Sequence, residues 1–354
     1  MNPNHRLPVT PPRRILIIRL SAIGDIVFAS GLIPALKARY PNVVIDWVVE
    51  ESYQDLLKAH PGLDKLYLWP RRRWGGLWRE RQWPTLIGEM KTLIKQFRAR
   101  RYDWILDTQG LFKSGLFARL AQGQFRVGLG SREGSQWWMD QVVSRKTQDR
   151  RIASEYLQLL RELGVEPGDT PLDIYLSLGH QKEAEDILKG LNIHGPYVVM
   201  CPFTTRPQKH WLQARWPQLA KSVQSQWGFP GLVVGAPSDK EAAEDIAKES
   251  GAACLSAAGL TSIGVSAALI QKAALVVGVD TGMTHLGIAF QRPMVALFGA
   301  TRPYLDPGFA KAKVLYRPRE CSPCRKRPIC HGRYDCMREW RVSDVMEAIE
   351  KVIR

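Results

Sequence analysis

The sequence contains no apolar run of the roughly 18 residues that a membrane-spanning helix needs. Its opening segment, MNPNHRLPVTPPRR, is polar and proline-rich, and no apolar core follows its basic residues, so it does not resemble a secretory signal. Motifs of the common RNA- and DNA-binding modules are also missing. These absences argue against a helical transmembrane protein and predict a cytoplasmic one.

Cysteine is scarce, with six residues in a chain of 354. Cys201 and Cys254 stand singly in apolar surroundings, which predicts buried thiols. The other four fall within residues 321–336, and their spacing superficially resembles a zinc site. A lasting disulfide is disfavoured in the cytosol. A small metal or redox site and free structural thiols therefore both remain open for this cluster, whose members are Cys321, Cys324, Cys330 and Cys336.

Acidic residues are outnumbered: 34 Asp and Glu face 50 Lys and Arg, which gives a formal net charge of +16. A surplus of this size indicates an acidic partner, which could be nucleic acid, an anionic membrane surface or a phosphorylated substrate. Charge alone does not choose among them. The length suggests two domains, each with a core of its own.

Short apolar runs alternate with helical patterns, which predicts α/β structure with parallel sheets covered on both faces. The alternation pauses around residues 165–175, where glycine, proline and acids cluster, and then restarts. We therefore predict a flexible tail over 1–13, one domain over 14–175, a second over 176–342 that includes 321–336, and a terminal helix over 343–354 with Ser343 as its N-cap. The expected strands are 14–20, 43–50, 65–69, 104–110, 197–203, 231–236, 274–282 and 294–300, and the clearest helices are 29–41, 85–102 and 111–121.

Open parallel sheets bind ligands beyond the carboxyl ends of their strands, so the polar residues just after each strand are the candidates. In the second half, Asp280 ends a strand before a helix whose free amides can hold a phosphate, with Thr281 or Thr284 adding a hydroxyl. Lys209 offers a counter-charge for a diphosphate. In the first half, Asp25 places an acid at a helix start, as a cap or as a base.

Four segments in order resemble glycosyltransferase family 9: RLSAIGDIVFASGLIPALK, DTQGLFKSGL, FTTRPQKHW and GVDTGMTHLGIAFQRPMVALFGAT. They are more similar to the heptosyltransferase I branch, whereas the cysteine segment is similar to heptosyltransferase II-like members. The resemblance implies a GT-B fold, in which two Rossmann-like domains face a central cleft. It also implies that the first domain holds the acceptor, that the second holds the ADP-sugar, and that transfer inverts the anomeric carbon without a metal or other cofactor.

The same resemblance implies roles for individual residues. Asp25 corresponds to the general base, and Lys209 to the residue that neutralises the departing diphosphate. Asp239 stands where the family has a glutamate at the ribose, and Glu241 is a nearby substitute for this shorter acid. The remaining implied contacts are Thr204 and Thr205 at the diphosphate, Asp280, Thr281, Gly282 and His285 at the donor sugar and phosphates, and Ser21 and Lys113 on the acceptor side.

Residues 69–84, WPRRRWGGLWRERQWP, combine five arginines with four tryptophans. We predict a non-helical, mobile loop. Arginine forks suit the carboxylates and phosphates of an anionic acceptor, and tryptophan suits a membrane interface, so Arg71, Arg72 and Arg73 are acceptor candidates. A plain solvated loop and nucleic-acid binding with bases stacked on tryptophan remain as alternatives.

The function predicted from the sequence is transfer of heptose from ADP-L-glycero-D-manno-heptose to the Kdo of lipopolysaccharide. The enzyme would work as a peripheral protein at the inner face of the cytoplasmic membrane, with no nucleic-acid partner. Transfer to the first heptose, use of another nucleotide sugar by a GT-B enzyme, and a non-catalytic basic protein that binds lipid or RNA are the alternatives. The oligomeric state is left open.

Overall fold

The computed structural model describes residues 10–168, 172–324 and 327–354. The chain divides into two compact units. Unit 1 comprises Met1–Asp149 and Ala153–Tyr175, and unit 2 comprises Arg150–Ile152 and Leu176–Arg354. Of the tail predicted over 1–13, residues 1–9 lie outside the described part, and the first strand begins at Arg14.

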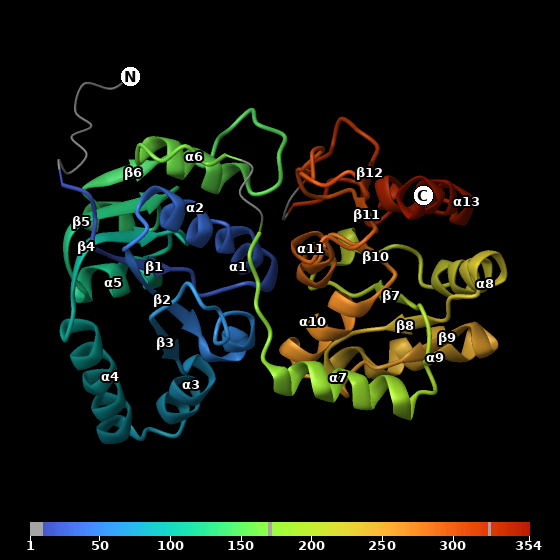
Figure 1. Cartoon of the computed structure of the whole chain (residues 1–354), viewed down its shortest axis with the longest axis horizontal. Helices are drawn as coiled ribbons and strands as arrows, with labels where there is room; N and C mark the ends of the chain where they lie inside the picture. The colour runs from blue at the N-terminus through green and yellow to red at the C-terminus, as the bar shows by residue number, and fades with distance from the viewer. Residues whose placement is uncertain (1–9, 169–171, 325–326) are drawn as a thin grey trace. The chain divides into compact units, whose positions relative to one another are not determined.

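Unit 1 is built on a six-stranded parallel sheet in the order β3-β2-β1-β4-β5-β6 (Figure 1). The central strand β1 pairs with β2 on one side and β4 on the other, so that Ile15 lies beside both Ile45 and Trp104. The chain reverses its direction of winding between β1 and β4, which makes the carboxyl ends of these strands a ligand-binding position. The strands are β1 (Arg14–Ile18), β2 (Val44–Glu50), β3 (Lys65–Trp69), β4 (Arg101–Asp107), β5 (Gln122–Leu129) and β6 (Gln141–Val143).

Helices cover both faces of this sheet, because successive residues of a strand point to opposite faces and both sets are apolar here. Leu16 and Ile18 of β1 pack with Phe97 and Phe117 from the helices of one face. Ile15 and Ile17 point to the other face and are fully buried as well. The helices are α1 (Ile23–Ser30), α2 (Leu32–Arg39), α3 (Arg71–Arg79), α4 (Trp83–Arg98), α5 (Phe112–Leu120) and α6 (Ser154–Glu162), with short 3-10 helices η1 (Glu51–Leu56) and η2 (Ser135–Trp138).

Unit 2 repeats the same plan with the strand order β12-β11-β10-β7-β8-β9. All its pairs are parallel, and β7 and β10 are the neighbours at which the winding reverses. The predicted α/β class with two Rossmann-like units is therefore confirmed. The strands are β7 (Val198–Cys201), β8 (Gly231–Val233), β9 (Cys254–Ser256), β10 (Leu275–Val279), β11 (Met294–Phe298) and β12 (Ala312–Tyr316).

The main apolar core of unit 2 lies between its sheet and α8, α9 and α13, and Trp216 is its largest fully buried side chain. On the other face, α10 packs against α7 and α11. The helices are α7 (Leu178–Gly190), α8 (Arg215–Trp227), α9 (Lys240–Glu249), α10 (Ile263–Lys272), α11 (Gly282–Ala289), α12 (Asp335–Arg338) and α13 (Val342–Ile353), with 3-10 turns η3 (Pro207–Lys209), η4 (Pro237–Asp239) and η5 (Gly251–Ala253).

The arginine- and tryptophan-rich stretch 69–84 is not the non-helical loop that its composition predicted. It ends β3, forms α3, and enters α4, so that α3 and α4 make a helical hairpin (Figure 1). Leu77 is the buried side chain that anchors α3. Arg73 and Trp74 also donate hydrogen bonds to Glu89 of α4, at 2.8 and 3.0 Å. These contacts outweigh the low helix propensity of Gly75 and Gly76.

Two helix boundaries also differ from the predictions. The helix expected over 29–41 begins earlier, at Ile23, and is divided into α1 and α2 at Gly31. The terminal helix begins at Val342, so Ser343 lies inside its first turn and is not the N-cap. Arg341 is the N-cap instead, and its amide donates to Asp344 at 2.8 Å. An acid three residues after the cap supplies the missing hydrogen bond here.

Candidate functional site

A buried polar cluster lies at the carboxyl edge of the unit 2 sheet, where β7 and β10 are neighbours. Asp280 follows β10, and Lys209 comes from η3, which follows β7. The Lys209 Nζ lies 2.6 Å from Asp280 Oδ2 and also donates to the Asp280 carbonyl at 3.3 Å. Two residues 71 positions apart are therefore brought together by the parallel topology.

Asp280 receives further donors from the chain that follows it. His285 Nε2 lies 3.3 Å from its Oδ1, and the Thr301 hydroxyl donates to Oδ2. Burial alone would raise the pKa of this carboxyl, but the His285 hydrogen bond and the Lys209 charge hold it well below the ordinary range. The carboxylate is thus ionised at neutral pH, and three donors take three of its roughly four acceptor positions.

Tyr304 extends the cluster by one residue. Its hydroxyl lies 3.0 Å from His285 Nδ1. Burial, reinforced by the Asp280 charge, raises the pKa of Tyr304 well above its ordinary value, so the phenol is protonated at neutral pH. Because His285 Nε2 faces the Asp280 carboxylate, a neutral His285 ring with its proton on Nε2 can accept the Tyr304 hydroxyl at Nδ1. Neither Thr301 nor Tyr304 was a candidate from the sequence, although both lie in the loop that follows β11 at the same sheet edge.

The start of α11 is the helix N-terminus at which the sequence analysis placed a phosphate. Thr281 is its N-cap in an extended conformation without a side-chain capping bond, and the helix begins at Gly282. The amides of its first turn therefore retain hydrogen-bonding capacity for a phosphate. Thr284 is different: it is buried and donates to the Val279 carbonyl at 2.8 Å, so its hydroxyl has a structural role.

The loop after β7 places the two candidate threonines near Lys209. Thr204 is half-buried and Thr205 is exposed. His210 Nε2 lies 2.9 Å from the Thr204 carbonyl, and this contact holds the two ends of the turn 204–210 together. The Thr204 and Thr205 hydroxyls and the Lys209 amine therefore belong to one short turn.

Asp239 already has a local partner, because its Oδ2 accepts a hydrogen bond from the Ala236 amide at 2.8 Å. Glu241 is exposed in the first turn of α9. Beside this loop, Leu260 leaves 56% of its surface exposed, which is unusual for a large apolar side chain. The neighbouring Gly259 packs against Pro237: a Cβ at Gly259 would lie 3.3 Å from the Pro237 Cα. Leu260 was another residue that the motifs did not indicate.

In unit 1, Asp25 lies in the first turn of α1, just beyond the carboxyl end of β1. Its side chain is 44% exposed and forms an ion pair with Arg19. It also accepts a hydrogen bond from the Ala22 amide at 3.4 Å. Asp25 therefore caps its helix, which was one of the two roles expected from the sequence, while part of its carboxylate still faces solvent.

Arg19 is the residue that organises this edge. It is buried, and its Nη1 donates to the Thr108 carbonyl at 2.6 Å. Gln109 accepts from the Ser21 amide at 3.2 Å and donates to the Ser21 hydroxyl at 3.3 Å. The loops after β1 and β4 are thereby held together. Ser21 and residues 107–116 were among the motifs found in the sequence, but Arg19 was not a candidate, because it lies in the strand predicted over 14–20.

A basic group surrounds Trp69 at the end of β3. The Lys113 Nζ lies 5.4 Å from the centre of the Trp69 ring, and the Arg71 guanidinium carbon lies 5.9 Å from it. Burial and the Arg71 charge lower the pKa of Lys113. Arg71 also lies 3.4 Å from Glu50, a nearly buried carboxylate. Cationic groups are therefore concentrated at this edge of unit 1.

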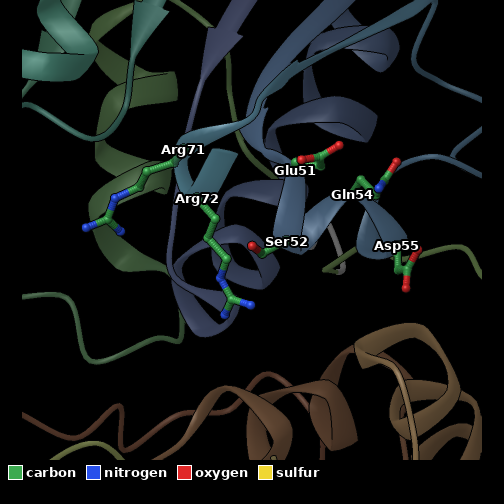
Figure 2. A pocket seen from close by; sticks show the side chains of 6 residues that line it. All are labelled: Glu51, Ser52, Gln54, Asp55, Arg71 and Arg72. Atoms are coloured by element: carbon green, nitrogen blue, oxygen red, sulfur yellow. The ribbon is translucent and has the colours of Figure 1, made fainter. Parts of the chain in front are cut away.

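A cavity of about 360 Å³ opens beside this group. Arg71 and Arg72 contribute to its wall from α3, and their guanidinium groups point in different directions (Figure 2). Arg73 belongs elsewhere, since it is engaged by Glu89. The structure thus separates the three arginines that the sequence placed together. The lining residues are Glu51, Ser52, Gln54, Asp55, Arg71 and Arg72.

The cysteine cluster holds free thiols. Cys336 is buried, and burial together with the neighbouring cysteines raises its pKa. Within residues 10–168, 172–324 and 327–354, no group of three or more His, Cys, Asp or Glu side chains is arranged to hold a metal ion. Cys201 and Cys254 are buried free thiols, as predicted, and burial raises the pKa of each to about 12.

Within the part of the chain that the structure describes, no helix has the length and apolar character to cross a bilayer.

The model of glycosyltransferase family 9 (heptosyltransferase) matches residues 90–334, which is more than half of the chain. The chain belongs to this family. The matched region includes the loop after β4 and the whole Lys209–Asp280–His285 cluster. The enzyme is therefore a family 9 glycosyltransferase, as its four ordered segments predicted.

Two curated family 9 proteins align with most of this chain. Lipopolysaccharide heptosyltransferase 1 of Pseudomonas aeruginosa is 28% identical over 320 residues, covering 89% of this chain and 86% of the relative. Lipopolysaccharide heptosyltransferase 2 of Salmonella typhimurium is 27% identical over 354 residues, covering 96% and 98%. The chain is therefore nearly as similar in sequence identity to this heptosyltransferase 2 as to this heptosyltransferase 1.

The solved structure of Escherichia coli heptosyltransferase WaaC with ADP-2-deoxy-2-fluoro heptose shares the architecture. Its TM-score is 0.71 at 25% identity, with 95% of this chain and 99% of that chain covered. The predicted GT-B fold is confirmed at the level of its two six-stranded α/β units.

Proposed function

We propose that this family 9 enzyme transfers heptose from ADP-heptose to the inner core of lipopolysaccharide. The Lys209–Asp280–His285 cluster at the β7/β10 edge is the observation that carries the proposal, because it combines a cation for a diphosphate with a sugar-binding acid. The family match and the names of the relatives support the choice of heptose and of lipopolysaccharide.

On the donor side, Lys209, the hydroxyls of Thr204 and Thr205, and the amides at the start of α11 bind the diphosphate. Asp280 accepts hydrogen bonds from heptose hydroxyls, and His285 holds its carboxylate in place. Asp239 or Glu241 contacts the ribose, and the exposed Leu260 gives the adenine an apolar surface. The charge that develops on departing ADP is then neutralised by a lysine and by fixed dipoles, so the reaction needs no metal ion.

On the acceptor side, Asp25 is the general base. The acceptor hydroxyl attacks the anomeric carbon, ADP leaves from the opposite face with the bonding electrons, and Asp25 takes the hydroxyl proton, so the configuration is inverted. The Arg19 guanidinium and the Ala22 amide orient the carboxylate. Carboxylate bases of this kind contribute about 10²–10⁴-fold to rate when they lie within hydrogen-bonding reach of the proton.

The acceptor itself is anionic and lipid-linked in this proposal. Arg71, Arg72 and Lys113 bind its carboxylates and phosphates at the end of β3, with Ser21 nearer the base. The enzyme then works as a peripheral protein at the inner face of the cytoplasmic membrane. We take Kdo as the accepting sugar. The first heptose is the second candidate, favoured by the similarity to heptosyltransferase 2 along 96% of the chain.

Purified enzyme should be offered ADP-heptose with either Kdo-lipid A or its singly heptosylated product. Turnover on Kdo-lipid A alone supports the first assignment, and turnover only on the heptosylated acceptor supports the second. Calorimetric titration of ADP, UDP and GDP tests the donor in parallel. No turnover on either acceptor, combined with preference for a nucleotide other than ADP, would overturn the proposed function.

A further inference from the structure

The helix α4 has an apolar face wider than the core of unit 1 covers. Leu86, Leu93 and Phe97 are buried on one side of it. Adjacent to them around the helix are Trp83, Ile87 and Met90, spaced by four and three residues so that they share one face. Their exposed fractions are 38%, 49% and 37%, respectively.

The turn between α3 and α4 enlarges this apolar surface. Trp78, at the end of α3, is 62% exposed. Its ring contacts that of Trp83 edge to face, with 4.3 Å between the ring centres. Tryptophan pairs of this kind suit the boundary between water and hydrocarbon, because the indole ring is apolar and its N–H is polar.

Basic side chains flank this face. Arg79 and Arg81 lie at the turn of the hairpin, and Lys91, Lys95 and Arg98 lie along α4; all five are exposed. Only two acids lie between positions 79 and 98, Glu80 and Glu89, and the carboxylate of Glu89 is neutralised by Arg73. An apolar stripe beside a cationic flank is typical of a helix that lies in the interface of an anionic membrane.

We propose that the α3–α4 hairpin docks this enzyme on an anionic phospholipid bilayer, with Trp78, Trp83, Ile87 and Met90 inserted among the headgroups. Lys91, Lys95 and Arg98 then bind lipid phosphates, while their aliphatic stems extend along the apolar stripe. This inference rests on the peripheral membrane location given in the proposed function, and it assigns the lipid-binding surface, which works without donor or acceptor.

The test compares two double variants of the full-length chain, I87E/M90E and T85E/T92E. Thr85 and Thr92 are exposed about 180–200° around α4 from the apolar stripe. Both variants add two negative charges to the same helix, so their net charges are equal. Co-sedimentation with vesicles of phosphatidylcholine and about one-third phosphatidylglycerol should fall about tenfold or more for I87E/M90E, and less than about threefold for T85E/T92E.

Three results would overturn this inference. If the wild-type enzyme fails to bind the anionic vesicles, the hairpin is not a lipid-binding surface. Equal losses in the two variants show attraction by charge alone, without insertion. A wild-type dimer that I87E/M90E converts to a monomer, as measured by light scattering, assigns the face to a second copy of the chain.

Two further measurements separate this inference from folding and from the proposed function. Both variants should keep wild-type ADP affinity and thermal midpoint, because the substituted side chains are exposed. Transfer to a soluble, deacylated acceptor should also be unchanged. If I87E/M90E keeps its ADP affinity but loses transfer to the soluble acceptor, the face belongs to the acceptor site and the docking inference is wrong.

Discussion

Lys209 and Asp280 bind each other directly at the carboxyl edge of the unit 2 sheet, with 2.6 Å between Nζ and Oδ2. The same two residues are the proposed ligands of the diphosphate and of the donor sugar. Removing either one breaks this ion pair, and the kinetic effects of the two substitutions should differ in kind because their proposed ligands differ.

Lys209→Ala should lower kcat and not merely raise KM for ADP-heptose. The lysine matters most as negative charge grows on the departing diphosphate, so its contribution is larger in the transition state than in the ground state. Steady-state kinetics over a range of donor concentrations gives both parameters. A variant with unchanged kcat and a raised KM would show that Lys209 only binds the ground state.

Asp280→Ala should weaken ADP-heptose binding more than ADP binding, because the acid contacts the sugar in our proposal. Calorimetric titration with each nucleotide measures the difference. Equal losses for the two ligands would make Asp280 a structural residue that only holds Lys209 and His285.

Asp280 should also make stability depend on pH. Its folded pKa is held below the unfolded value of about 3.9, so the stabilisation is fully present above about pH 4 and is lost as pH falls further toward the folded pKa. Urea unfolding should show wild type more stable than Asp280→Asn at neutral pH, with the gap closing in acid. Asp245→Asn, at an exposed position on α9, is the control and should track wild type throughout. A gap that is constant with pH would contradict the lowered pKa.

Eight strands and part of the donor cluster could be predicted because their signals are local, whereas β5, β6, β9 and β12 were not predicted. A buried parallel strand is a continuous apolar run, and an acid or threonine placed directly after it must lie at the sheet edge. Asp280 and Thr281 were found in this way, whereas His285 became a candidate only through the family resemblance. Thr301 and Tyr304 were missed because their role depends on β11 lying beside β10, a pairing that no local pattern reports.

The α3–α4 hairpin was predicted wrongly because its local sequence favours a loop. Residues 69–84 have glycines, prolines and an irregular apolar pattern, which favours a loop when the stretch is considered alone. Leu77 in the core and the bonds from Arg73 and Trp74 to Glu89 stabilise α3 from outside the segment. The role of Arg19 could not be predicted for a related reason. Its hydrogen-bond partner, the Thr108 carbonyl, lies 89 residues away in the sequence, and no local pattern links the two.

Arg71→Ala with Arg72→Ala should raise KM for the lipid acceptor about tenfold and leave ADP affinity unchanged. Each arginine lines the cavity beside Trp69 and can make a charge-assisted hydrogen bond to a carboxylate or phosphate. Arg73→Ala is the matched control, because Arg73 is already engaged by Glu89. Part of the effect should fade with salt, since exposed charges are screened over about 8–10 Å at physiological ionic strength. A larger KM change for Arg73→Ala than for the double variant would show that Arg71 and Arg72 are not the arginines that bind the acceptor.

EDTA should leave initial turnover unchanged. The chain has no Asp-x-Asp motif, and in our proposal Lys209 and the α11 amides neutralise the diphosphate in place of a bridging metal ion. The assay should be read at early times, so that a slow loss of stability is separated from an effect on the chemistry. Activity that disappears with EDTA and returns with Mg²⁺ would contradict this prediction.

Asp25→Asn should abolish transfer and leave ADP affinity nearly intact. The amide keeps the size of the side chain and can still accept from Ala22, so the helix cap is preserved, but it cannot take the acceptor proton. The expected loss in kcat is about 10²–10⁴-fold. Arg19→Lys is the companion variant: it keeps the charge beside Asp25 but loses the guanidinium geometry, so it should lower kcat less than Asp25→Asn does. Single-turnover rates and calorimetry on the same preparations measure both quantities. Turnover of Asp25→Asn within a few-fold of wild type would leave Asp25 as a helix cap and require another base.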